Sequence, residues 1–204
     1  MTRTIKYSLT LTVVAVVCAV ALSYTHSFTM PYIENTSHNL EKSSREAVIG
    51  TGYTFNEEEK KVYNNLEFIP AYKNGNLDAY VVKSVTKEGY GGEIIFSMGI
   101  DLDGKIKGVK IIESKETPGL GSKINEEITI NGEKKYWGNI WIGRDKDYKF
   151  NKSVDAFAGA TVSPMAVYKE IIKTLNIFEK IKIDLNKGPV ENSDENIPNE
   201  EGAM

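Results

Sequence analysis

The segment from Asp155 to Pro164 (DAFAGATVSP) has the residue types that could hold a phosphate group at the start of a helix. Ser163 suits the N-cap of a helix and Pro164 its first position, so the first unpaired N–H groups are expected just after Thr161. Those groups and the helix dipole stabilise a phosphate. The small pair Gly159-Ala160 leaves room for a bulky group beside the backbone. A phosphate attached to the Thr161 hydroxyl would therefore be stabilised.

The same segment is also typical of an ordinary turn, in which Thr161 merely enters a helix. Other residues could likewise either bind a ligand or have an ordinary structural role. Lys123 could neutralise a phosphate, although a lysine is more often solvated surface. Four aromatic residues could stack on a flat ring, but in a small domain such residues more often form the core, and we favour the core for Tyr136, Trp137, Trp141 and Tyr148.

The composition excludes several classes of function. The chain has two histidines and one cysteine, so thiolates cannot build a zinc or iron–sulfur centre. Because Cys18, His26 and His38 all precede the expected folded domain, a serine or cysteine protease triad has few candidates. No nucleotide-binding glycine motif and no zinc-protease motif is present. The net charge of -3 gives no reason to expect nucleic acid as a partner. If this protein does redox chemistry, its carrier must be organic, and we expect no metal.

The N-terminal region has the pattern of a membrane signal. No charged side chain occurs from Tyr7 to Ile33, and about 20 apolar residues suffice to cross a bilayer as a helix. We therefore predict a transmembrane helix over 7–25, with residues 1–6 in the cytoplasm because Arg3 and Lys6 precede the span. A cleaved signal peptide, with cleavage near Ala21-Leu22-Ser23, is the alternative. Both interpretations place the remaining chain outside the cytoplasm.

The positioning elements follow from patterns of polarity and turn residues. A helical stalk is expected over 26–50, a folded domain over 51–183, and a disordered acidic tail over 184–204. Within the domain the patterns predict strands at 77–86, 93–102 and 105–112, strand and loop at 137–150, and helices at 57–64, 122–127 and 164–178. The expected fold class is α+β: a small domain with a central antiparallel sheet, tethered by one N-terminal transmembrane helix.

Three motifs resemble those of a known family. Asp155 to Thr161 resembles the D-x-x-(S/T)-G-A-T signal that a flavin transferase reads before it attaches FMN to the final threonine. Glu116 to Gly121 resembles the ETPGLG loop that lies against the flavin, and 89–101 resembles the glycine-rich start of a strand. The family is the FMN-binding G component of the Rnf electron-transport complex, with the C component of the sodium-pumping NADH:quinone reductase as a relative. The resemblance extends from the anchor helix to about residue 178.

The resemblance implies an FMN-binding domain with one FMN per chain, bound covalently through a phosphoester to Thr161. It implies flavin contacts by a set of small and loop residues: Thr117, Gly119, Leu120, Gly159, Ala160 and Ser163. Asp155 would serve transferase recognition, and Glu116 either steers the loop or is a solvated charge. Ala158 departs from the signal, because a serine or threonine usually stands there and supplies a hydroxyl.

The implied function is an electron relay without catalytic residues of its own. Members of this family serve a membrane complex that passes electrons between ferredoxin and NAD⁺ and couples this flow to Na⁺ or H⁺ translocation. The expected partners are the other subunits of that complex, a flavin transferase during maturation, and the cell membrane. Two alternatives stay open: the C component of the quinone reductase, and a non-redox extracytoplasmic binding or scaffold protein with a degenerate motif.

Overall fold

The computed structural model describes residues 2–130 and 132–185. The chain divides into two compact units, Met1–Ser43 and Ser44–Met204. Helix α1 (Thr2–Ile49) contributes to both of them. Most of the tail predicted for 184–204 lies outside the described residues, and so does the first residue of the predicted cytoplasmic segment.

The described part of the first unit is a single helix. The predicted span over 7–25 and the predicted stalk over 26–50 are therefore not separate elements. Its segment Ile5–Met30 is 26 residues long, has a mean hydropathy of 2.1 and is not buried by the rest of the protein. Threonine hydroxyls within this segment donate to carbonyl oxygens one turn earlier, as Thr12 does to Ser8 at 2.9 Å, so these hydroxyls are satisfied without water. Ile5–Met30 is a candidate membrane span, although a signal sequence has the same length and composition.

The last residues of α1 belong to the second unit and pack on its sheet. Val48 and Ile49 are buried in a small apolar cluster with alanines and a valine of the sheet: Ala71, Ala79 and Val81. The hydroxyls of Ser44 and Ser97 form a buried hydrogen bond of 2.7 Å. Residues expected in the stalk thus help to form the domain.

An antiparallel six-stranded sheet forms the centre of this unit. Its strands are β1 (Tyr53–Phe55), β2 (Lys61–Tyr63), β3 (Leu66–Lys73), β4 (Asn76–Thr86), β5 (Ile94–Asp101) and β6 (Ile106–Ser114). The order is β1-β3-β4-β5-β6, and β2 also pairs with β3. The three predicted strands and the α+β class are confirmed.

The helix predicted over 57–64 is wrong, because this stretch contains β2 and the turn that follows it. Asn64 and Asn65 both have positive φ angles, of 49° and 62°, which is the backbone of a tight hairpin turn between antiparallel strands. The Asn-Asn pair therefore connects β2 to β3 and prevents a helix from continuing through it.

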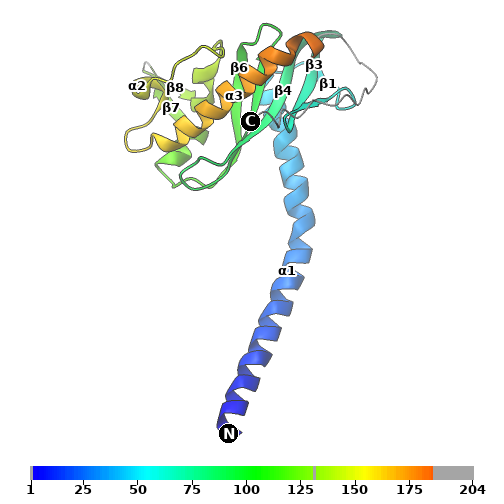
Figure 1. Ribbon diagram of the computed structural model, residues 1–204, viewed down its shortest axis with the longest axis vertical. Coiled ribbons are helices and arrows are strands. Elements are labelled where there is room, and N and C mark those ends of the chain that lie inside the picture. Colours follow the sequence, from blue (N-terminus) through cyan, green and yellow to red (C-terminus); the bar gives the residue numbers. More distant parts are fainter. Residues whose placement is uncertain (1, 131, 186–204) are drawn as a thin grey trace, which may run out of the picture. The chain divides into compact units, whose positions relative to one another are not determined.

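Helix α3 (Val162–Leu185) covers the other face of the sheet and forms the main core (Figure 1). One of its faces buries four apolar residues at helical spacing: Val167, Ile171, Leu175 and Phe178. They pack against side chains such as Phe68, Phe96 and Met98 from the strands. The predicted helix over 164–178 is confirmed, and it extends further at both ends.

Smaller elements close one side of the domain. They are the 3-10 helix η1 (Gly121–Asn125), the hairpin strands β7 (Glu127–Ile130) and β8 (Glu133–Tyr136), the 3-10 helix η2 (Trp137–Trp141) and the short helix α2 (Lys152–Asp155). The strand predicted within 137–150 is wrong, since η2 and a loop occupy this stretch. Trp137 and Trp141 are fully buried, which confirms their assignment to the core.

Candidate functional site

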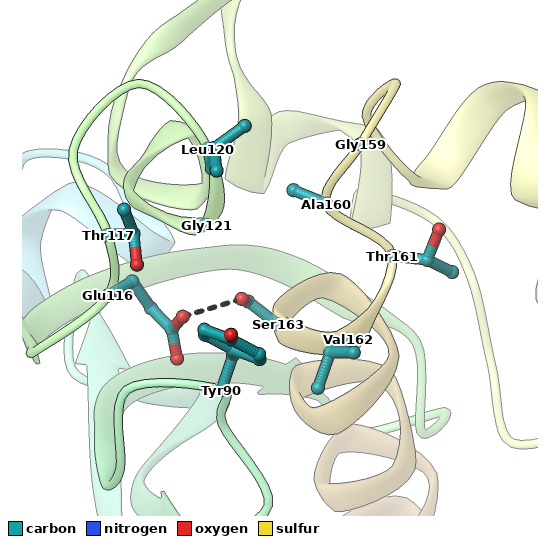
Figure 2. A pocket seen from close by; sticks show the side chains of 10 residues that line it. All are labelled: Tyr90, Glu116, Thr117, Leu120, Gly121, Gly159, Ala160, Thr161, Val162 and Ser163. Carbon is teal, nitrogen blue, oxygen red and sulfur yellow. Dashed lines mark hydrogen bonds between the residues drawn. The ribbon is translucent and has the colours of Figure 1, made fainter.

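Three segments that are far apart in the sequence enclose a cavity of about 340 Å³. They are the glycine-rich turn before β5, the loop after β6, and the start of α3 (Figure 2). The lining residues are Tyr90, Glu116, Thr117, Leu120, Gly121, Gly159, Ala160, Thr161, Val162 and Ser163. All but one of the predicted flavin contacts are thus brought together; Gly119 lies in the same loop but does not line the cavity.

Glu116 joins the three segments at one side of this cavity. Ser163 Oγ of α3 donates to its Oε2 at 2.8 Å, and the backbone N–H of Gly91 donates to its Oε1 at 3.2 Å. The Glu116 side chain is only 7% exposed, so the solvated interpretation is wrong. Figure 2 shows the Glu116 and Ser163 side chains pointing toward each other.

Gly121 is required by this arrangement because nothing larger fits beside Glu116. A Cβ at Gly121 would lie 2.5 Å from both Glu116 Oε2 and Ser163 Oγ, well inside the contact distance of such atoms. The last glycine of the ETPGLG loop therefore allows the loop to close against the carboxylate. The resemblance alone did not explain why a glycine stands at this position.

Thr161 immediately precedes helix α3, which begins at Val162. The N–H of Met165 donates to the Thr161 carbonyl oxygen at 3.1 Å, as in the first turn of a helix. The prediction that Ser163 is the N-cap and Pro164 the first helical residue is therefore wrong by two positions. The physical reason is that the Ser163 hydroxyl donates to Glu116 instead of capping the helix.

The side chain of Thr161 points away from Glu116 (Figure 2). Thr161 also lines a second hollow, of about 250 Å³, whose other residues include Lys152 and Lys169. Glu88 lies there as well and accepts from Lys169 Nζ at 2.6 Å. Lys123, the cation considered from the sequence, lines neither hollow.

Asp155 is fully buried and holds the loop that leads to Thr161. Its carboxylate accepts from Arg144 Nη1 at 2.9 Å, from Tyr148 Oη at 2.7 Å and from the backbone N–H of Asn151 at 2.8 Å. Its carbonyl oxygen accepts from Trp137 Nε1 at 3.1 Å. Burial, with the bond to Asp155, raises the pKa of Tyr148 to about 12. No signal in the sequence groups Arg144 with Asp155.

Unlike Asp155, two residues further along this loop are exposed. Ala158 and Gly159 are exposed, whereas Ala160 is buried and Thr161 is intermediate. Gly159 has a φ of +81°, and a Cβ there would be 3.7 Å from Leu120 across the cavity. Because Ala158 is exposed and does not line the cavity, a hydroxyl at this position would face solvent.

The sequence model of the FMN-binding domain family matches residues 89–176, the stretch that contains all three cavity segments. Residues 89–176 are thus similar to an FMN-binding domain. The cavity fits this cofactor. Its volume lies in the range of small-molecule sites, and Tyr90, Leu120 and Val162 supply apolar surface. The start of a long helix at Val162 suits the phosphate.

Several curated proteins, all named as the G component of an ion-translocating oxidoreductase complex, are similar over a larger part of the chain. The one from Vibrio parahaemolyticus is 35% identical over 128 residues, 59% of this chain and 58% of that protein. The one from Photorhabdus laumondii is 29% identical over 195 residues, 86% of this chain and 90% of that protein. One from Haemophilus influenzae is 36% identical over 107 residues, which are 49% of this chain and 50% of that protein. The chain thus spans little more than half the length of most of these relatives in the matched segments.

Proposed function

We propose that this protein is the electron-relay subunit of a membrane-bound ferredoxin:NAD⁺ oxidoreductase of the Rnf type, coupled to Na⁺ or H⁺ translocation, and that it carries one FMN as a phosphoester on Thr161. The match to the FMN-binding domain family and the names of the similar proteins support the redox part of this proposal. One observation supports the attachment site most directly: Thr161 is the threonine that lies both at the cavity and at the start of α3.

Two threonines line the cavity, and their surroundings differ. The N–H groups of Val162 and Ser163 follow Thr161 in the first turn of α3, where no earlier helical carbonyl exists to accept from them. Lys152 and Lys169 lie on the other side of Thr161. An anionic phosphate is stabilised by such donors and charges. Thr117 precedes only the short η1 helix, so its hydroxyl lacks this setting.

The protein residues bind and orient the cofactor, and the flavin supplies the electron transfer. Leu120 and Ala160 face each other across the opening of the cavity (Figure 2), so a flat ring between them is held in one orientation. Tyr90, Leu120 and Val162 give that ring apolar surface to pack against. A covalent bond to Thr161 keeps the cofactor attached where no cytoplasmic flavin can replace it.

The proposed location follows from α1. We propose that Ile5–Met30 is retained as a single membrane anchor, with Arg3 and Lys6 on the cytoplasmic side and the FMN domain outside. A membrane-impermeant thiol reagent tests this in intact cells expressing a Cys18→Ala, Lys87→Cys variant, since the Lys87 side chain is 82% exposed. Labelling without lysis supports the proposed side, and labelling only after lysis contradicts it.

The attachment site is tested by coexpression of the full chain with a flavin transferase. After denaturation, we expect flavin fluorescence to migrate with the protein, and the intact mass to increase by one FMN less one water. Thr161→Ala should abolish both signals, Thr161→Ser should keep them because the hydroxyl remains, and Thr117→Ala is the matched control that should also keep them. A fluorescent Thr161→Ala protein, or a colourless native one, contradicts the proposal.

A further inference from the structure

Glu116 is a carboxylate inside the flavin cavity, not at its rim. Its side chain lines the cavity and is 7% exposed. Both of its oxygens accept hydrogen bonds, from Gly91 N–H and from Ser163 Oγ–H. Two donors suit an ionised carboxylate, which can only accept, and burial of a charge requires such partners.

No positive side chain balances this charge at the site. Among the residues that line the cavity in the described structure there is no lysine, arginine or histidine, and no ion pair of Glu116 occurs in that part of the chain. Its stabilisation comes from the two hydrogen bonds and from the first turn of α3, to which Ser163 belongs. The cations near Thr161 line the other hollow.

Glu116 also determines the shape of the cavity. It connects the turn at Gly91, the loop at Gly121 and helix α3 at Ser163, the three segments that form the walls. A Cβ at Gly89 would lie 2.5 Å from Glu116 Oε1, and one at Gly121 would lie 2.5 Å from Oε2. The chain therefore encloses this carboxylate closely on two sides, and its position is fixed.

We propose that Glu116 is a positioning residue that also lowers the midpoint potential of the bound FMN. This inference rests on the proposed function, because it requires a flavin in this cavity. Each electron that enters the cofactor without a proton adds one negative charge to the site. A fixed anion that is itself only 7% exposed opposes that addition, because Coulomb interactions are stronger where water is excluded than in bulk water.

Glu116→Gln tests the charge with little change in shape. A glutamine can accept from Gly91 N–H with its carbonyl oxygen and donate to Ser163 Oγ with its amide group. The full chain is matured with the transferase, purified in detergent and titrated with dithionite and mediator dyes while its visible spectrum is followed. We expect the midpoint potential to rise by at least about 59 mV for a one-electron step. At a fixed ambient potential, this shift changes the ratio of reduced to oxidised flavin tenfold.

Two further variants separate the charge from general effects. Glu170→Gln is the matched control, since Glu170 is similarly buried at 8% exposure, lies on α3 and does not line the cavity. Its potential should equal that of the native protein. Ser163→Ala removes one hydrogen bond to Glu116 and keeps the charge, so it should lower thermal stability without raising the potential.

The outcomes are distinct. A Glu116→Gln protein that is flavinylated and has the native potential overturns the inference and leaves the proposed function intact. An equal rise in Glu116→Gln and Ser163→Ala also overturns it, because the effect would then come from the shape of the cavity. A native protein without covalent flavin overturns the proposed function itself, and the inference with it.

Discussion

Arg144 Nη1 lies 2.9 Å from Oδ1 of Asp155, whose side chain has no exposed surface. The pair connects the loop after η2 to the start of the segment that ends at Thr161. Tyr148 and the Asn151 N–H complete the set of donors to the carboxylate. The proposed acceptor threonine is therefore presented by a loop whose base is held inside the domain.

Removing Arg144 should destabilise the domain strongly. In Arg144→Met the buried Asp155 carboxylate loses its ionic partner, and breaking such a pair costs about 3 kcal/mol or more. Thermal and urea unfolding of the full chain in detergent measure this. Lys146→Met is the control, because the pair of Lys146 with Asp147 at 3.6 Å is exposed and should contribute less than about 1 kcal/mol. Equal losses in the two variants would contradict the role of the buried pair.

Flavin attachment should become faster when this network is loosened. The predicted recognition of Asp155 by a transferase requires the loop to open, because the carboxylate is buried in the folded domain. Tyr148→Phe removes one hydrogen bond, about 1 kcal/mol, and should raise the open population about fivefold. The initial rate of flavinylation of the purified apoprotein measures this. A slower rate would mean that Asp155 acts by holding the closed loop in place.

Gly121→Ala should damage the cavity more than its small size suggests. The new Cβ would lie 2.5 Å from Glu116 Oε2 and Ser163 Oγ, so the hydrogen bond between them must break or the loop must move. Such overpacking costs about 1–3 kcal/mol, and covalent flavin should also decrease. The control is Ser122→Ala next to Gly121, whose hydroxyl accepts from Gly119 N–H and donates to Glu126. Normal flavin content in Gly121→Ala would argue against this geometry.

Asp78 should make stability depend on acid pH. Hydrogen bonds from Lys107, at 2.5 Å, and from Tyr53 lower the pKa of Asp78 below its ordinary value of 3.8. A carboxyl with a lowered pKa in the folded state stabilises the protein above its unfolded pKa and loses this effect as the pH falls through the folded one. Asp78→Asn should therefore melt lower than the native protein at pH 7 and equally at pH values below both pKa values.

Lys107→Met serves as the partner variant for this pH series. It removes the first cause of the lowered pKa, so it should reproduce the loss at pH 7 and should also remove most of the acid dependence. Because both side chains are partly exposed, the effect should be small and should shrink at high salt. A native-like melting temperature for both variants at pH 7 and low salt would contradict a role for this pair.

Ala158→Ser should leave the mature protein nearly unchanged. Ala158 is exposed and does not line the cavity, and surface substitutions of this kind change stability by about 0.5 kcal/mol at most. We expect the same final flavin content and melting temperature as in the native chain. Higher flavin content in Ala158→Ser would show that the missing hydroxyl limits maturation.

The sequence by itself determined the elements whose signals are local. The patterns of polarity and turn residues predicted β5 and β6 correctly, and apolar residues at helical spacing predicted α3. The uncharged N-terminal run identified the candidate span. Three short motifs also sufficed to name most of the cavity residues. The helix expected over 57–64 failed because the conformation of Asn64 and Asn65 is selected by the pairing of β2 with β3.

Only the tertiary structure decided how the motif residues act. Asp155 belongs to the same short motif as Thr161, but burial makes it the base of the loop. Glu116 looked like a steering residue or a surface charge, but Ser163 and Gly91, distant in sequence, place it inside the cavity. Helix α3 begins at Val162, two residues before the predicted start, and the Ser163 hydroxyl donates to Glu116 instead of capping the helix. Burial and hydrogen bonding depend on partners that folding brings together, and no local pattern around these residues records them.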